Sequence, residues 1–163
     1  MKKLIINLEF EQYNNLNELN NSDASLFEAA IQAANTAYAP YSKFQVGAAV
    51  LLESGVIVKG SNQENAAYPS GLCAERVALF AAGSQYPGIK VKSIAVTVKG
   101  LNETISEPVS PCGDCRQVMA EFEHRFNSEI RLIMPAENGS ILVCRNVRSL
   151  LPFMFNSDHL KEN

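Results

Sequence analysis

Two cysteines separated by two residues are the first candidates for chemistry in this sequence. Cys112 and Cys115 enclose a Gly-Asp pair, and the motif is predicted to open a helix whose first turn places both thiols on one face. The spacing is compatible with half of a zinc site, with a redox pair or with two buried cysteines. A redox pair is typical of a thioredoxin-like arrangement, where the motif follows an early strand, whereas this motif comes late in the chain.

A third cysteine favours a metal site. Cys73 also begins a predicted helix, and one predicted strand separates that helix from Cys112. Two β-to-α crossings of one sheet would bring both helix N-termini to the same edge, beyond the carboxyl ends of the strands, where open α/β sheets place their sites. Three thiolates would hold zinc and leave its fourth position to water, as in catalytic zinc sites.

A fourth protein ligand would instead indicate a closed, structural zinc site. Cys144 ends the apolar segment 141–144, which favours a small buried core residue. His124 is predicted on the solvated surface of a helix, and His159 is predicted to be exposed near the end of the chain. Because no good fourth ligand is found, we expect an open site.

Glu75 lies two residues after Cys73. Positions i and i+2 of a helix point in nearly opposite directions, so both side chains share a site only if the metal lies off the helix end. There Glu75 could act as the base for zinc-bound water without binding the metal. Taken alone, it could equally be a glutamate that the helix dipole favours at an N-terminus.

Zinc with three thiolates carries a net negative charge and is a poor Lewis acid unless positive charge offsets it. The two helix N-termini supply partial positive charge. Arg76 and Arg116, each next to a ligand position, are candidates for donating a hydrogen bond to a thiolate sulfur. Either arginine could instead be a surface residue. A surface role is harder to accept for Arg76, because its predicted helix is apolar almost all round.

Composition and charge limit the class of protein. The chain has 163 residues, of which 47% are apolar and 19% charged, which excludes a wholly disordered or coiled-coil chain. Its net charge of −3, with no lysine or arginine cluster, gives no electrostatic footprint for nucleic acid. The longest apolar run, 46–52, is far shorter than the about 20 residues of a membrane helix. We therefore expect a cytoplasmic protein with reduced thiols and no membrane partner.

The chain divides into two predicted parts. Residues 1–21 form an Asn-rich extension in which Leu4, Ile6, Leu8 and Phe10 alternate with other residues. Such an extension is either loosely attached or adds a strand to a sheet edge. Residues 22–163 are predicted to form a single domain.

The hydrophobic pattern predicts the elements of that domain. A first helix is expected to start at a Ser25–Glu28 capping box and to be stopped by Pro40. Residues 99–111 are predicted to be a loop. The other predicted helices cover residues 73–82, 113–126 and 146–151, and the predicted strands cover residues 44–52, 56–60, 91–98, 130–134 and 140–144.

These elements predict an α/β fold with three layers, α/β/α, around a five-stranded mixed sheet. Helices between the later strands imply right-handed crossovers that cover both faces of the sheet. The link between residues 134 and 140 is too short for a crossover, so the last two strands must be antiparallel. The helix at 73–82 is apolar almost all round, which predicts burial in the core or against another subunit.

Two motifs carry a resemblance to a known family. Cys73-Ala-Glu75-Arg76, followed by Pro111-Cys-Gly-Asp-Cys-Arg-Gln117, resembles the zinc nucleoside deaminases. Further blocks at 38–49, 62–68 and 150–152 extend the resemblance over about residues 26–155. The cysteine in first ligand position, the Asn62-x-Glu64 segment and the short final hairpin are similar to the small homotetrameric cytidine deaminases among these enzymes.

The resemblance implies an enzyme of pyrimidine salvage, a hydrolase acting on the C–N bond of a cyclic amidine. It would convert free cytidine and deoxycytidine to uridine and deoxyuridine plus ammonia. One Zn²⁺ per subunit would be held by Cys73, Cys112 and Cys115, with Glu75 as proton shuttle for zinc-bound hydroxide and Arg76 in support. The only small-molecule partner would be the nucleoside, and neighbouring subunits of a homotetramer would complete each other's pockets.

The resemblance also implies contacts with the substrate, although each of these residues could simply be a core, loop or packing residue. The implied contacts are Phe44 stacking on the base, Asn62 and Glu64 on the ribose hydroxyl, the Ala74 N–H on base O2, the Ser110 carbonyl on the amino group, and Tyr68 and Phe155 in a neighbouring pocket. Asp114 departs from expectation, because an acid between two thiolates should slightly raise the pKa of the bound water. Two alternatives stay open: a deaminase of another aminopyrimidine nucleoside such as blasticidin S, and a non-catalytic structural zinc module.

Overall fold

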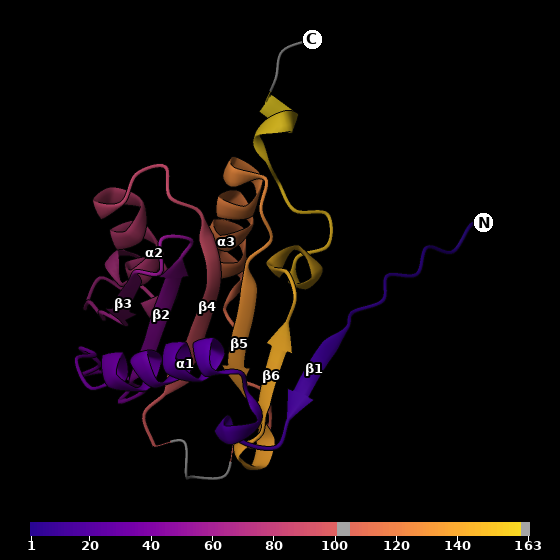
Figure 1. Cartoon of the computed structure of the whole chain (residues 1–163). Coiled ribbons are helices and arrows are strands. Elements are labelled where there is room, and N and C mark those ends of the chain that lie inside the picture. The colour runs from indigo at the N-terminus through magenta and orange to yellow at the C-terminus, as the bar shows by residue number, and fades with distance from the viewer. Residues whose placement is uncertain (101–104, 161–163) are drawn as a thin grey trace.

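A six-stranded mixed sheet forms the centre of the computed structural model, which describes residues 1–100 and 105–160 (Figure 1). Residues 101–104 of the predicted loop and 161–163 of the predicted domain lie outside this range. The strand order is β1-β6-β5-β4-β2-β3. The strands are β1 (Phe10–Tyr13), β2 (Val46–Leu52), β3 (Ile57–Ser61), β4 (Val91–Val98), β5 (Arg131–Pro135) and β6 (Ile141–Cys144).

Three α-helices cover the sheet, α1 on one face and α2 with α3 on the other (Figure 1). Alternate residues of β2 show this division: Ala48 and Val50 pack in the core under α2 and α3, whereas Ala49 and Leu51 pack under α1. The predicted three layers are therefore confirmed. The helices are α1 (Asn21–Ala34), α2 (Ala74–Gln85) and α3 (Gly113–Phe126), and 3-10 turns lie at Leu16–Glu18, Tyr68–Ser70, Glu137–Gly139, Val147–Leu150 and Ser157–Leu160.

The number of strands differs from the prediction, because the extension contributes a sixth. β1 pairs antiparallel with β6, with Phe10 opposite Cys144. Arg131 holds this edge in place: its guanidinium donates to Glu11 at 2.8 Å and to the buried Asp23 at 3.0 Å. Of the alternating apolar residues in the extension, only Phe10 belongs to the strand.

The predicted start of the first helix is wrong. Helix α1 begins at Asn21, and the Asn20 side chain caps it by accepting a hydrogen bond from the Asp23 N–H. Ser25 lies inside the helix. Asparagine and serine are comparably good N-caps, so the sequence offers two starts, and the Asn20 amide also donates to the Asp23 carboxylate. The helix ends at Ala34, well before Pro40.

The connections bring the N-termini of α2 and α3 together. β4 and β5 are parallel, with α3 as the crossover, and β5 and β6 are antiparallel as predicted. Helix α2 connects β3 to β4, which both pair antiparallel with β2. Both crossover helices begin at the same edge of the sheet, where residues from β2 and β4 line a common cleft with Cys73 and Cys112.

Gly60 lets α2 approach β3 closely. A Cβ at this position would lie 2.4 Å from the Ala78 nitrogen and 2.6 Å from the Ala74 oxygen. Only a residue without a side chain permits this backbone contact. The glycine thereby sets the position of the first turn of α2, which carries the candidate catalytic residues.

Candidate metal centre and active site

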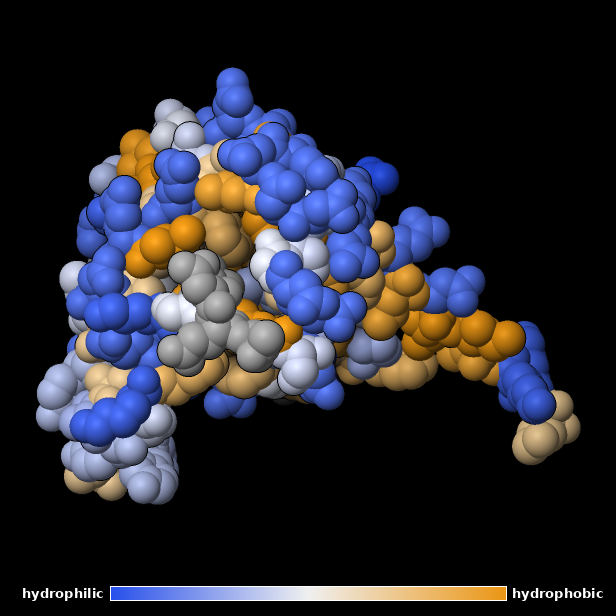
Figure 2. All heavy atoms as spheres, turned by 90° about the horizontal axis from the view of Figure 1, so that it is seen from below, coloured by the Kyte–Doolittle hydropathy of each residue, from blue (hydrophilic) through white to orange (hydrophobic). Residues whose placement is uncertain are grey.

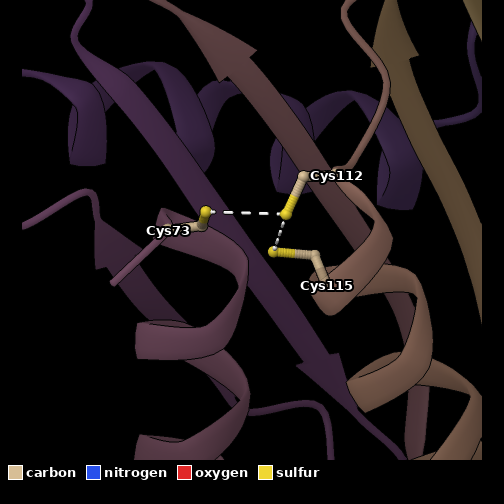
Figure 3. Close-up of side chains that lie close together, drawn as sticks. All are labelled: Cys73, Cys112 and Cys115. Atoms are coloured by element: carbon tan, nitrogen blue, oxygen red, sulfur yellow. Dashed lines mark hydrogen bonds between the residues drawn. The ribbon is translucent and has the colours of Figure 1, made fainter. Parts of the chain in front are cut away.

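Three sulfur atoms meet between the ends of α2 and α3 (Figure 3). The Sγ atoms of Cys73 and Cys112 are 3.8 Å apart, those of Cys112 and Cys115 are 3.5 Å apart, and all three lie within 4.8 Å of one another. Zn–S bonds of about 2.3 Å at tetrahedral angles place sulfurs roughly 3.8 Å apart. The three side chains therefore fit a zinc ion as they stand.

The helix ends explain why these thiols favour a cation. Cys73 and Cys112 are the N-cap residues of α2 and α3, and neither side chain caps its helix. Cys115 is buried in the first turn of α3. Two helix N-termini carry partial positive charge, which favours a negatively charged zinc–thiolate cluster between them.

The pKa values of Cys73 and Cys115 are shifted in opposite directions. The neighbouring Cys115 thiol, within 4.8 Å, and then Arg76 lower the pKa of Cys73 to about 5 despite partial burial. The interaction with Cys73 is the largest cause that raises the pKa of Cys115, and burial is the second.

Arg76 is the arginine that contacts a ligand sulfur. Its guanidinium donates to Cys73 Sγ at 3.9 Å and forms an ion pair with Asp114, also at 3.9 Å. Arg116 instead donates to the carbonyls of Pro111 and Leu150. Asp114 is thus a counter-charge for Arg76 at the rim of the site.

Glu75 is buried beside the sulfurs, with only 4% of its surface exposed. Burial raises the pKa of its carboxyl, and the negative Cys73 thiolate raises it further. Buried glutamates are rare unless paired or functional. Glu75 shares the cleft with Cys73 and Cys112, so a carboxyl that readily holds a proton stands next to the candidate metal.

The cleft has a volume of about 640 Å³. It gathers six of the seven predicted substrate contacts. These are Phe44, Asn62, Glu64, Tyr68, Ala74 and Ser110. Phe155 is not among the described lining residues; it is exposed and stacks on His159, with ring centroids 5.4 Å apart.

Two of the predicted substrate-binding side chains, Asn62 and Glu64, also form hydrogen bonds to the backbone that lines the cleft. The Asn62 amide accepts from the Val46 N–H at 2.8 Å and donates to the Phe44 carbonyl at 2.9 Å. The Glu64 carboxylate accepts from the Tyr41 N–H at 2.9 Å and from both the N–H and the hydroxyl of Ser42. These bonds fix the segment from which the half-exposed Phe44 ring faces the cleft.

Sequence reasoning missed several lining residues. Tyr41, Ser42, Leu72, Val96 and Val109 also face the cleft. Tyr41 and Ser42 lie inside the block at 38–49, which already carried part of the family resemblance, so this block could have identified them as site residues. Val96 lies inside the eight-residue strand β4, whose apolar pattern does not say which of its residues reaches the site.

The other candidate ligands lie elsewhere. Cys144 is buried and its thiol donates to the Asn146 carbonyl at 3.0 Å, so the predicted core role is confirmed. His124 is half-buried, not solvated as predicted, and its ring hydrogen-bonds the Ser157 hydroxyl at 3.0 Å. Within residues 1–100 and 105–160, no fourth cysteine, histidine or carboxylate joins the three sulfurs, which agrees with an open site.

The sequence matches a family model described as the cytidine and deoxycytidylate deaminase zinc-binding region over residues 20–127. The chain belongs to this family. The cytidine deaminase of Halalkalibacterium halodurans is 52% identical over 138 residues, which are 84% of this chain and 96% of that protein. The cytidine deaminase of Mycobacterium tuberculosis is 37% identical over 131 residues, covering 80% and 87% of the two chains.

Solved structures of cytidine deaminases share the fold of this deaminase. The crystal structure from Burkholderia pseudomallei has a TM-score of 0.69 at 39% identity and covers 80% of this chain and 97% of that one. The structure from Mycobacterium tuberculosis has a TM-score of 0.63 at 36% identity and covers 81% and 95%. The predicted resemblance, fold and zinc cofactor are thus confirmed, and the three cysteines are the residues that fit the metal.

Proposed function

We propose that this deaminase hydrolyses free cytidine and deoxycytidine to uridine and deoxyuridine plus ammonia, as an enzyme of pyrimidine salvage. The observation that carries the proposal is the buried Glu75 beside an open set of three thiolates in one cleft. The relatives named cytidine deaminase, at up to 52% identity, support the same substrate.

Zinc held by Cys73, Cys112 and Cys115 would lower the pKa of its water from 15.7 to about 7 and so supply the nucleophile. Glu75 would move the protons. Its carboxyl takes one from the attacking water and passes it to pyrimidine N3, then takes the remaining proton of the added hydroxyl and delivers it to the amino group, which leaves as ammonia. The raised pKa of Glu75 suits this exchange, because a proton carrier works best when its pKa is near the working pH.

The walls of the cleft would orient the base. Ala74 is the first residue of α2, so its N–H has no partner within the helix and can donate to the base O2. Arg116 donates to the Ser110 hydroxyl and to the Pro111 carbonyl, and these bonds hold the loop that contains Ser110. The backbone carbonyl of Ser110 would accept a hydrogen bond from the amino group of the pyrimidine. The exposed Phe44 ring would stack on the pyrimidine.

The sugar would lie against Asn62 and Glu64. Each of these side chains still has donor or acceptor capacity beyond its bonds to the backbone, which a ribose hydroxyl can use. Hydrogen bonds from Ser42 hold the pKa of Glu64 below its ordinary value, so its carboxylate is ionised at neutral pH. An ionised carboxylate in the cleft favours an uncharged nucleoside over a nucleotide.

A homotetramer in which neighbouring subunits complete the pockets is part of the proposal. Tyr68, Phe155 and Phe80 on α2 are 77%, 57% and 48% exposed. Large exposed aromatic residues are typical of interfaces. The proposal also includes a single domain, 22–163, with residues 1–21 as an extension. It places the enzyme in the cytoplasm, where the four cysteines, none of which forms a disulfide, would stay reduced. None of the helices in the described residues has the length and apolar character to cross a bilayer.

Ammonia release by the zinc-loaded enzyme tests the substrate. Cytidine, deoxycytidine, deoxycytidylate and blasticidin S are compared at equal concentration, and zinc per chain is measured on the same sample. We expect turnover of the first two, with little on the other two. A fully zinc-loaded enzyme that is inactive on cytidine but active on blasticidin S would point to the related deaminase. Inactivity on all four would instead support a structural zinc module.

A further inference from the structure

The segment before β1 leaves the body of the molecule as an extended arm (Figure 1). The arm comprises residues 1–9, all exposed, which belong to no helix or strand within the described part of the chain. The family match begins only at residue 20, so the arm is additional to the deaminase core. Figure 2 shows apolar side chains gathered along this protruding segment.

Three apolar residues of the arm alternate, whereas a further one, Ile5, is 79% exposed between two of them. Leu4, Ile6 and Leu8 are 73%, 49% and 48% exposed, and a period of two places them on one face of an extended strand. A contiguous exposed apolar strip marks an interaction site. The unpaired backbone of an extended segment is in addition a template for a partner strand.

The order of residues in the arm is self-complementary. When two arms run antiparallel with Ile6 opposite Ile6 of a second copy, Leu4 faces Leu8 and Lys3 faces Glu9 of that copy. Apolar residues then oppose apolar residues on one face. On the other face Lys3 opposes Glu9, and Ile5 opposes Asn7. Opposed apolar residues and opposed opposite charges stabilise strand pairs. A shift by one residue would set Leu4 opposite Asn7 or Glu9, and a shift by two would lose the pairing of Lys3 with Glu9. Within residues 1–9, the register centred on Ile6 is therefore the one that matches both apolar and charged residues.

We propose that the arm binds the arm of a second copy of this chain as a two-stranded antiparallel ribbon centred on Ile6. The contact is symmetric and closes on itself, as two-fold interfaces do. A two-stranded ribbon alone is marginal in water. It therefore forms where subunits are already held near each other, because tethering raises the effective concentration of the second arm. This interaction is separate from catalysis.

Cysteine cross-linking in the full chain tests the register. In the ribbon, the two copies of residue 6 lie with Cα atoms about 4.5–5.5 Å apart, within reach of a disulfide. We expect Ile6→Cys, treated with oxidised glutathione, to give a covalent dimer on a non-reducing gel, above the background of the unmodified chain. Leu4→Cys is the matched control, because two copies of residue 4 would lie about 13 Å apart.

Chains carrying Leu4→Cys and Leu8→Cys should cross-link only when mixed, since these positions oppose each other. Equal yields from Ile6→Cys and Leu4→Cys alone, or no yield from any variant, would overturn the proposal. The second of these outcomes is expected if the arm binds its own body or a different protein.

Charge reversal tests the same ribbon independently. Lys3→Glu in the Ile6→Cys chain places like charges opposite each other in both symmetric pairs, and we expect cross-linking to slow roughly tenfold. Adding Glu9→Lys should restore the original rate. A double reversal that stays as slow as the single one would contradict the pairing. Cytidine turnover per chain should be unchanged throughout, so failure of this proposal is distinguishable from failure of the proposed function.

Discussion

Arg76 connects the sulfur cluster to the rim of the active site. It contacts Cys73 Sγ and Asp114 at the same distance, 3.9 Å. Its positive charge offsets part of the negative charge that three thiolates place around zinc. Asp114 is 79% exposed at its side chain and pairs with the same guanidinium. We therefore expect this acid to influence the metal through Arg76.

Replacing Arg76 with glutamine should weaken both the metal site and catalysis. Groups that orient metal ligands typically contribute about 10–100-fold to metal affinity or activity, and we expect a loss in this range in kcat and in zinc affinity. Zinc competition with a chelator and steady-state kinetics measure the two effects. Arg145→Gln removes an ion pair with Glu129 on the surface and should change neither, whereas an unchanged Arg76→Gln enzyme would contradict the role of Arg76.

The charge of Glu11 should stabilise the enzyme at neutral pH but not in acid. The hydrogen bond from Arg131 holds the pKa of Glu11 below its ordinary value. A carboxyl with a lowered folded-state pKa contributes stability above its unfolded pKa, and this is lost as the pH falls through the folded pKa. Because Glu11 is largely exposed, the contribution is at most about 1 kcal/mol.

Thermal unfolding of the enzyme and of Glu11→Gln measures this effect. The variant should melt a few degrees lower at pH 7, and the difference should vanish well below the ordinary carboxyl pKa. A difference in melting temperature that stays constant from neutral pH to strong acid would show that the charge of Glu11 is not what stabilises β1.

At the scale of elements, the contact between α2 and β3 positions the catalytic turn. Gly60→Ala places a Cβ against the backbone of α2, and the helix must move. Overpacking of this kind costs about 1–3 kcal/mol, so we expect a lower free energy of unfolding together with a lower kcat/KM. Both follow from the same displacement, because Cys73 and Glu75 lie at the start of this helix.

Gly83→Ala is the matched control within α2. Its new Cβ would meet only the ring of Phe122, at 3.3 Å, and a side chain can adjust where backbone cannot. We expect near-normal activity and stability from this variant. Equal losses from Gly60→Ala and Gly83→Ala in denaturation and kinetics would show that close packing on β3 does not set the position of the site.

Helices and strands whose bounds are set by residues within or next to them could be predicted from the sequence. Strand β4 and helix α3 occupy the predicted ranges, because apolar periodicity and turn residues define both. The start of α1 was missed since Asn20 and Ser25 are both acceptable caps. β1 could not be placed, because its position depends on pairing with β6 and on the distant Arg131.

The active site, too, has parts that follow from local sequence and parts that depend on contacts between distant residues. Cysteine spacing and the order of strands and helices were enough to bring Cys73, Cys112 and Cys115 together. The backbone bonds of Asn62 and the contacts of Arg116 with the Leu150 carbonyl join residues far apart in the sequence. Nothing in local sequence specifies such contacts.

At the scale of the whole molecule, zinc held by the three cysteines would connect α2 and α3, which pack on the same face of the sheet. Removal of zinc by a chelator should abolish deamination and lower the melting temperature, because a ligand bound only by the folded state stabilises it. For a protein of this size, each kcal/mol lost lowers the melting temperature by about 2–4 °C. Calorimetry with and without added zinc measures the shift.

Restoring zinc should recover both activity and melting temperature, which controls for damage by the chelator. Loss of activity with no change in melting temperature would mean that the metal does not hold α2 and α3 together. Full activity after complete zinc removal would contradict a metal-dependent site.

We expect Glu75 to move protons in an enzyme that hydrolyses cytidine with zinc held by three thiolates. The most direct test is kcat for cytidine in Glu75→Gln, with zinc per chain measured on the same sample and the exposed Glu121→Gln as control. Proton transfer of this kind contributes about 10²–10⁴-fold. We therefore predict a fall in kcat of at least about a hundredfold with one zinc per chain retained. A Glu75→Gln enzyme with full zinc and near-normal turnover would contradict the account.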